Sequence, residues 1–264
     1  MSTSAPLPLR GRAVLVTRPV QQADALAALI RDAGGEPVLF PALAIESPTD
    51  LAKVGAVLAD LPSVDLVIFV SPIAAERTFA LLKAAWPAAV AVAAVGEGTA
   101  SALRRHVLQP PGGGVIVPTE GADSEALLAS RELQEMRGKR VLICRGEGGR
   151  ELLAEELRRR GAQVSYAECY RRVRPAADPS ELIDRWERGG LHAVTALSGE
   201  TLDNLWAMLG ARGQQLLRGT PLFVPHANIA ERAARLGLTE LAITPPGDAG
   251  IVRGLSAWFS LHAR

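Results

Sequence analysis

Polar residues and glycines gather in five short turns, each of which follows a predicted strand and precedes a predicted helix. The start of a helix exposes unpaired backbone N–H groups and the positive end of the helix dipole, which together bind anionic groups. A single Ser or Thr at such a place is more often an ordinary helix cap. Because Ser and Thr recur at equivalent positions in these strand-to-helix turns, we favour an acidic ligand. The candidate ligand-binding residues of these turns are Thr17, Arg18, Ser71, Pro72, Gly96, Gly98, Thr99, Arg145, Gly146 and Ser198.

The chain has only two tyrosines, Tyr166 and Tyr170, which lie four residues apart in an extended segment. In a regular strand this even spacing places both side chains on one face, although a bend would separate them. Tyr170 falls in segment 169–175, which we expect to run between domains. A phenol stays protonated at neutral pH, so Tyr170 is a candidate proton donor. The alternative is a tyrosine that only packs where two domains meet.

Two glycine-rich turns resemble nucleotide-binding loops but lack residues that those loops require. The turn at 96–99 is followed by Ser101 where a dinucleotide-binding fingerprint has its third glycine, and the turn at 145–149 lacks the Lys and Ser or Thr of a phosphate-binding loop. The histidines and cysteines have no metal-ligand spacing. No G-x-S-x-G elbow surrounds Ser71 or Ser198. The sequence therefore argues against a metal site, a nucleoside triphosphate and a serine nucleophile, and gives only weak support to a nicotinamide cofactor.

The turns are positioned by strands and helices that alternate along the chain. Short β-branched runs alternate with longer amphipathic stretches, a pattern typical of parallel sheets with crossover helices. The first helix is expected from about residue 22 to residue 33. The predicted strands are 13–17, 66–70, 90–95, 115–117, 141–144, 164–168, 193–197, 221–224 and 241–244.

An internal repeat organises these elements. At a constant offset of 127 residues many positions carry the same residue in both copies, and the offset persists from the first strand to Leu82 and its match Leu209. A repeat of this kind indicates two similar structural halves. Matching pairs include Val14 with Val141, Arg18 with Arg145, Gly34 with Gly161, and Ser71 with Ser198.

The predicted fold class is α/β, with two similar doubly wound parallel-sheet (flavodoxin-like) domains joined by two crossing segments. The segments 41–47 and 169–175 occupy equivalent repeat positions, carry prolines and read as extended chain. They are therefore the expected interdomain crossings. Ligands of doubly wound sheets bind outside the carboxyl ends of the strands, so we expect the ligand in a cleft between the two sheets.

Composition excludes several classes of protein. The chain has 264 residues, of which 48% are hydrophobic and 22% charged, as in ordinary globular domains. A formal net charge of +1 argues against a nucleic-acid partner. Cys144 and Cys169 lie in apolar runs, which is typical of free thiols in a reducing compartment. Because no apolar run has the length of a signal peptide or a membrane span, we expect a soluble cytoplasmic protein without a membrane partner.

Six segments of the chain, taken in their order and spacing, resemble the uroporphyrinogen-III synthase family. No single segment is specific, but together they span nearly the whole sequence. They are VLVTRP at 14–19, PALAI at 41–45, FVSP at 69–72, AVGEGTA at 94–100, ECYRR at 168–172 and LDNL at 202–205.

The resemblance implies a two-domain enzyme in which the first strand and helix pack with the C-terminal part of the chain. Residues 1–41 and 175–264 would form one domain and residues 47–169 the other. The family closes hydroxymethylbilane, a linear tetrapyrrole with eight carboxylates, into uroporphyrinogen III. The reaction inverts the terminal pyrrole ring, releases water and belongs to heme biosynthesis. The resemblance further implies a lyase that needs no cofactor, acts as a monomer and has transient contact with the preceding enzyme of the pathway.

The same resemblance makes Tyr170 the favoured general acid, because a tyrosine in this crossing is the family's best catalytic candidate. Three turns depart from the family pattern. Ile73 stands where the family often has a small polar residue, and Leu197 stands where a hydroxyl residue commonly precedes Ser198. Residues 225–230 read PHANIA where many members have Gly and Thr, so His226 or Asn228 would replace their contacts to substrate carboxylates. The alternative for this turn is a solvated loop.

Two other functions remain open on the sequence alone. A non-catalytic two-lobed binding protein for an acidic small molecule would fit the two halves and the helix starts, but it would leave Tyr170 unexplained. A nicotinamide-dependent oxidoreductase would require the cofactor to bind at residues 96–99.

Overall fold

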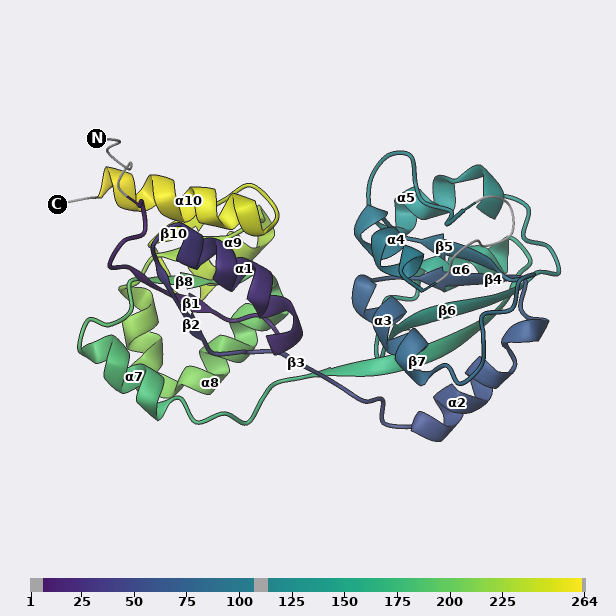
Figure 1. Cartoon of the computed structure of the whole chain (residues 1–264), viewed down its shortest axis with the longest axis horizontal. Coiled ribbons are helices and arrows are strands. Elements are labelled where there is room, and N and C mark those ends of the chain that lie inside the picture. Colours follow the sequence, from purple (N-terminus) through teal and green to yellow (C-terminus); the bar gives the residue numbers. More distant parts are fainter. Residues whose placement is uncertain (1–6, 107–113, 263–264) are drawn as a thin grey trace. The chain divides into compact units, whose positions relative to one another are not determined.

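The computed structural model describes residues 7–106 and 114–262. The chain divides into two compact units (Figure 1). Unit 1 combines the part of the chain up to Ala44 with the part from Val173 onward, and unit 2 is the continuous segment Ile45–Arg172. The chain thus passes from one unit to the other twice. Each unit has its own five-stranded sheet and its own core.

Unit 1 has the strand order β10-β9-β8-β1-β2, and each of its neighbouring strand pairs is parallel. Alternate residues of β1 face opposite layers: Val14 and Val16 contact α1 and α10, whereas Leu15 contacts the layer formed by α7, α8 and α9. Both faces of the sheet are therefore buried, as parallel sheets require. The elements are β1 (Ala13–Val16), α1 (Val20–Asp32), β2 (Glu36–Leu39), α7 (Ser180–Glu187), β8 (Ala193–Thr195), α8 (Gly199–Arg218), β9 (Leu222–Val224), α9 (Ala227–Arg235), β10 (Leu241–Ile243) and α10 (Asp248–Leu261).

Unit 2 has the strand order β3-β7-β6-β4-β5, with parallel pairing of β7 to β6, β6 to β4, and β4 to β5. One face of this sheet packs against α2, α3 and α4, and the other packs against α5 and α6. The elements are β3 (Ala44–Glu46), α2 (Leu51–Ala59), η1 (Leu61–Ser63), β4 (Leu66–Phe69), α3 (Pro72–Leu81), β5 (Ala91–Ala94), α4 (Glu97–Arg104), α5 (Ser124–Ala129), η2 (Arg131–Leu133), β6 (Arg140–Gly146), α6 (Leu152–Arg159) and β7 (Gln163–Val173).

The α/β fold class predicted from the sequence is confirmed. The repeat also has a structural counterpart, because the central strands β1 and β8 of unit 1 occupy the places of β6 and β4 in unit 2. The paired serines behave alike. Ser71 Oγ accepts the backbone N–H of Ala74 at the start of α3, and Ser198 Oγ accepts that of Thr201 at the start of α8.

Two predicted strands differ from the structure. β7 continues to Val173, beyond the predicted end at Glu168: its pairing with β6 reaches Tyr170 through a register shift, and β3 is its neighbour on the other side. The apolar run at 115–117 forms only an isolated bridge, in which Ile116 pairs with Ala93. These are outcomes of tertiary pairing, which local sequence patterns do not encode.

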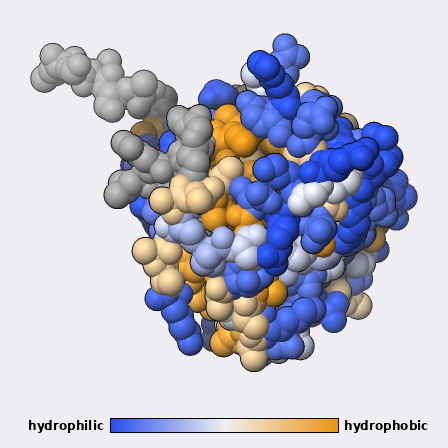
Figure 2. Space-filling view, turned by 90° about the vertical axis from the view of Figure 1, so that its right-hand side faces the viewer, coloured by the Kyte–Doolittle hydropathy of each residue, from blue (hydrophilic) through white to orange (hydrophobic). Residues whose placement is uncertain are grey.

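The surface of unit 2 mixes charged and apolar side chains on the face that Figure 2 shows. Many of the charges pair with a neighbour of opposite sign, such as Arg140 with Asp60 and Lys139 with Asp65. No helix within the described parts of the chain has the length and apolar character needed to cross a membrane.

We expect His192 to make the stability of unit 1 depend on pH. Its Nδ1 accepts the backbone N–H of Ala13 at 3.0 Å, and burial followed by the charge of Arg12 lowers the pKa of its ring. The folded state therefore prefers neutral His192. Its stabilising effect is complete above the ordinary pKa of about 6.5 and is lost as the pH falls through that value towards the lower folded pKa.

The test is urea unfolding of the wild type and His192→Asn at pH values between about 7 and 5, a range that spans the ordinary histidine pKa. Asn keeps an acceptor for Ala13 but cannot titrate. As the pH is lowered, the free energy of unfolding should decrease more in the wild type than in the variant. Equal decreases in the two proteins would contradict the assignment.

Candidate active site

The predicted site residues lie in two groups, one at the carboxyl edge of each sheet. In unit 2 this edge is formed by the ends of β4, β5, β6 and β7, and in unit 1 by the ends of β1, β8 and β9. Unit 2 carries Ser71, Pro72, Gly96, Gly98, Thr99, Arg145, Gly146 and Tyr170; unit 1 carries Thr17, Arg18, Ser198, His226 and Asn228.

A cavity of about 260 Å³ lies at the edge of unit 2 where β4 and β6 are neighbours. After β4 the chain enters α3 on one face of the sheet, and after β6 it enters α6 on the other face. This divergence is a topological switch point, where doubly wound sheets bind their ligands. The residues that line this strand-end cavity are Val70, Ser71, Val95, Ala122, Asp123, Ser124, Ile143, Arg145, Gly146, Gly149, Arg150, Leu153, Tyr170 and Arg172.

A larger groove, of about 830 Å³, lies between α2 and the end of α3. Its lining is apolar apart from Lys83. The strand-end cavity is smaller, but its lining brings together serine hydroxyls, a phenol, a carboxylate and three arginines beside apolar side chains. Convergent polar groups of this kind fix and orient a ligand, so the strand-end cavity is the better candidate.

Tyr170 is buried in the wall of this cavity, with 4% of its surface exposed. Its hydroxyl lies 3.3 Å from Ser71 Oγ, and either oxygen could donate in this contact. Ser71 Oγ also accepts the backbone N–H of Ala74 at 3.0 Å. Because that bond occupies only a lone pair of Ser71, its hydroxyl proton stays available to the phenol oxygen. The two hydroxyls can therefore hold or transfer a proton at the cavity wall.

The two tyrosines belong to different core clusters, although they lie four residues apart on one strand. Tyr170 packs in the cluster on the α2, α3 and α4 face, and Tyr166 packs in the cluster on the α5 and α6 face. Arg145 pairs with Glu168, whereas Gly146 pairs with Tyr170, so β7 has one extra residue at this point. Such a bulge interrupts the alternation of faces along the strand and separates the two phenols.

The proton of Tyr166 already has a partner inside the protein. Its hydroxyl donates a hydrogen bond to the carboxylate of Glu151. Burial, together with this bond and the charge of Glu151, raises the pKa of Tyr166 above its usual value. Tyr166 is thereby a weaker acid than an ordinary phenol, and its role in this structure is to hold Glu151.

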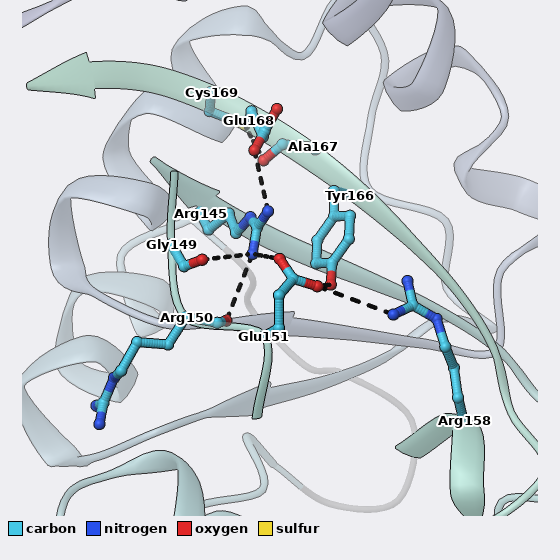
Figure 3. A network of polar contacts seen from close by, with 9 residues as sticks. All are labelled: Arg145, Gly149, Arg150, Glu151, Arg158, Tyr166, Ala167, Glu168 and Cys169. Carbon is cyan, nitrogen blue, oxygen red and sulfur yellow. Dashed lines mark hydrogen bonds and ion pairs between the residues drawn. The ribbon is translucent and has the colours of Figure 1, made fainter. Parts of the chain in front are cut away.

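Arg145, which lines the cavity, is the centre of a network of polar contacts (Figure 3). Its guanidinium pairs with Glu151 at 2.8 Å and with Glu168 at 3.1 Å, and it lies 3.8 Å from the ring centre of Tyr166. It also donates to the backbone oxygens of Gly149 and Arg150. The network thus ties the end of β6, the following turn, the start of α6 and β7 to one side chain.

The charge of Arg145 is well compensated in spite of its burial. Burial alone would lower its pKa, but the hydrogen bonds to Glu151 and Glu168 and the charge of Glu151 raise it overall. A buried cation is stable only with such partners. Within the described residues, its Nε is the buried side-chain nitrogen that lacks a hydrogen-bond acceptor. The Nη nitrogens of Arg145 therefore have structural partners, whereas its buried Nε–H has no acceptor within the described residues.

The turn that begins α4 lies next to the strand-end cavity rather than in its lining. Gly96 is buried against Ala122, and a Cβ on Gly96 would lie 2.9 Å from the Cβ of Ala122. Thr99 is also buried, whereas Gly98 and Pro72 are exposed. Of these four predicted residues, Gly98 and Pro72 are the ones that present surface to a ligand.

Sequence analysis missed several residues of the cavity wall. Asp123 caps α5 by accepting the backbone N–H of Ala126 at 2.8 Å, and Ser124 follows it. An Asp just before an apolar run is a helix-start signal that could have been used. Arg150 and Arg172 are exposed and carry no local pattern that would have pointed to the cavity.

In unit 1 the side chains of the predicted residues are largely engaged. Thr17 Oγ1 donates to the backbone oxygen of Thr195 at 2.6 Å, and Arg18 pairs with Asp248 at the start of α10. Ser198 caps α8. His226 and Asn228 are exposed at the start of α9. These last two are the most accessible polar side chains of the predicted set in unit 1.

Within the described ranges, no three His, Cys, Asp or Glu side chains come together as ligands for a metal ion. Cys144 and Cys169 are both buried free thiols. Cys169 Sγ lies 3.1 Å from Thr78 Oγ1, on the face of the sheet away from the Arg145 network. The polar side chains that line the strand-end cavity carry hydroxyl, phenol, carboxylate and guanidinium groups.

Two solved structures share the fold of the chain. Uroporphyrinogen III synthase from the extremely thermophilic bacterium Thermus thermophilus matches with a TM-score of 0.60 at 20% identity, covering 96% of this chain and 99% of that one. Uroporphyrinogen-III synthetase from Helicobacter pylori 26695 matches with a TM-score of 0.57 at 13% identity, covering 97% of this chain and 100% of that one. At these identities the likeness concerns the fold alone.

Sequence comparison goes further. The family model of uroporphyrinogen-III synthase HemD matches residues 24–249. Uroporphyrinogen-III synthase of Salmonella typhimurium is 36% identical over 240 residues, covering 89% of this chain and 96% of that protein. The Escherichia coli protein of the same name is 33% identical over the same shares of both chains. The chain therefore belongs to the uroporphyrinogen-III synthase family.

Proposed function

We propose that this protein converts hydroxymethylbilane into uroporphyrinogen III in tetrapyrrole biosynthesis, with inversion of the terminal pyrrole ring and loss of water. Family membership supports the reaction. The contact between Tyr170 and Ser71 in the wall of the strand-end cavity is the observation that carries the assignment of the acid.

The reaction needs a proton more than it needs a nucleophile. Protonation of the terminal hydroxyl of the bilane turns it into water, and the electron-rich pyrrole supplies the electron pair that expels it. Tyr170 would give this proton, and Ser71, 3.3 Å away, would donate a hydrogen bond to the phenolate that forms. The last pyrrole then attacks the electron-poor carbon with its already substituted α carbon, which gives a spirocyclic intermediate. The bond from that α carbon to its former bridge carbon breaks, the released bridge carbon is attacked by the other α carbon of the same ring, and loss of the proton from that carbon restores the acid.

The carboxylates of the bilane require donors at several places. Backbone N–H groups at the starts of α3 and α4, together with the hydroxyl of Ser198, are the proposed donors, whereas the single hydroxyl proton of Ser71 serves Tyr170. Arg145 would support this site indirectly by holding the turn after β6, because its Nη nitrogens bind Glu151, Glu168 and the backbone and its Nε is buried. Holding the substrate folded is what would select inverted closure over direct closure.

The proposal has four further parts. The resemblance supports a monomer that receives its unstable substrate through transient contact with the enzyme that makes it. The buried free thiols support a cytoplasmic location, and the internal repeat supports the segments 41–47 and 169–175 as the interdomain crossings.

The assignment is tested with freshly prepared hydroxymethylbilane and separation of the product isomers. The bilane closes spontaneously to the type I isomer, so the wild-type protein should yield the type III isomer in excess. Heat-denatured protein is the control. Formation of type I alone, at the spontaneous rate, would reject the function, and recovery of intact bilane would favour a binding protein instead.

Tyr170→Phe should lose most of the activity while keeping the fold. Removing a general acid typically costs a factor of about 10² to 10⁴ in rate, and the phenyl ring preserves the packing of Tyr170. Tyr166→Phe is the matched control, because it also removes a phenol from β7 but leaves Tyr170 in place. Turnover near the wild-type value in Tyr170→Phe, with type III as the product, would eliminate Tyr170 as the acid.

A further inference from the structure

We propose that Gly146 is a positioning residue, whose missing side chain creates the space in which the ring of Tyr170 lies. Only the expected effect on catalysis rests on the proposed function, because the contact between Gly146 and the ring of Tyr170 is a packing contact. Gly146 ends β6 and pairs with Tyr170 across the register shift.

The ring of Tyr170 lies directly against the backbone of Gly146. A Cβ built on Gly146 would be 2.7 Å from both Cε2 and Cζ of the ring and 3.2 Å from Cδ2. Carbon atoms in contact prefer about 3.5 to 4.0 Å. Gly146 is not among the glycines with positive φ, so the need for glycine here is steric and not conformational.

The backbone at Gly146 is anchored and cannot easily move away from the ring. On one side, Arg145 is held by Glu151 and Glu168 and donates to the turn that follows (Figure 3). On the other side, the backbone N–H of Glu147 donates to the backbone oxygen of Tyr170 at 2.9 Å. An added Cβ must therefore displace the ring rather than the strand.

The carboxylate of Glu147 fixes the same turn from a third direction. It accepts the backbone N–H of Thr49 at 2.6 Å and the hydroxyl of Thr49 at 3.0 Å. The residue after Gly146 is thus tied to the segment between β3 and α2. Arg145 and Glu147, the residues on either side of Gly146, are thus held by other elements. Gly146 itself lies against the ring of Tyr170.

Displacement of the ring would change the direction of the phenol. Tyr170 is buried, so its ring can escape the new Cβ only by rotating or by pushing on the neighbouring core. Either movement changes the 3.3 Å contact between its hydroxyl and Ser71 Oγ. Gly146 would thus act on the reaction through Tyr170, and not through contact with the substrate.

The kinetic test is the variant Gly146→Ala. We expect kcat to fall by about 10²-fold, as for a misplaced catalytic group, with a smaller change in KM. In the Tyr170→Phe background the same substitution should cost little further activity, because the hydroxyl whose position matters is already gone. Full additivity of the two losses would overturn the proposal. Gly55→Ala in α2, where a Cβ meets nothing within 4 Å, is the matched control.

A spectroscopic test does not depend on activity. Since the chain has only two tyrosines, ¹³Cζ-labelled tyrosine gives two ring signals, and the Tyr166→Phe variant identifies that of Tyr170. Gly146→Ala should shift the Tyr170 signal, whereas Gly55→Ala should not. An unchanged Tyr170 signal would overturn the proposal even if the protein is an active synthase, and a shifted one would support the packing even if the proposed reaction fails.

A third variant covers the case in which Gly146→Ala does not fold. Tyr170→Ala removes the ring that the new Cβ would meet, so Gly146→Ala should then be tolerated. The double variant should have the same midpoint of thermal unfolding as Tyr170→Ala alone. A further large drop in the double variant would mean that the Cβ meets something other than Tyr170, which would refute the proposal.

Discussion

The register shift between β6 and β7 sets the geometry of the strand-end cavity. Up to Glu168 the residues of β7 alternate between the two faces of the sheet in step with β6, and Arg145 pairs with Glu168 on the α5 and α6 side. One extra residue then brings Tyr170 opposite Gly146. The bulge therefore places the phenol of Tyr170 and the guanidinium of Arg145, which lie on neighbouring strands, on opposite faces of the sheet at this edge. Without it, Tyr170 would join Tyr166 and compete for the same carboxylates.

Duplication gave both units the same layout, but the two edges have diverged in their side-chain partners. Arg18 and Arg145 occupy equivalent strand ends, and each is neutralised by carboxylates of its own unit, Asp248 in one case and Glu151 with Glu168 in the other. Ser71 and Ser198 also occupy equivalent helix starts. The hydroxyl of Ser71 contacts that of Tyr170, whereas the hydroxyl of Ser198 contacts that of Thr201. The shared framework supplies backbone amides at the helix starts, and the divergence gives unit 2 the contact between Ser71 and Tyr170.

Sequence patterns predicted the framework well because it depends on local periodicity. Most strands, the alternation with helices, the repeat and the turns at the strand ends follow from short-range alternation and capping signals, whereas β2 and β3 are not among the predicted strands. The roles of Arg145 and Tyr166 could not be predicted in this way. Glu151 and Glu168 reach Arg145 from α6 and β7, and Tyr166 approaches it from the next strand. Such contacts depend on strand register, which a one-residue bulge alters without a clear mark in the sequence.

The division of unit 1 between the two ends of the chain has a consequence for synthesis on the ribosome. Unit 2 is one continuous segment, so it can fold once β7 has emerged. β1 lies in the middle of the other sheet, between β2 and β8, and β8 is made only after all of unit 2. The nascent chain must therefore carry an incomplete β1–β2 pair with an open edge while unit 2 is already finished. The sheet of unit 1 is complete only after its last strands have been made. Any pause in translation after β7 therefore lengthens the time for which the edge of β1 is exposed.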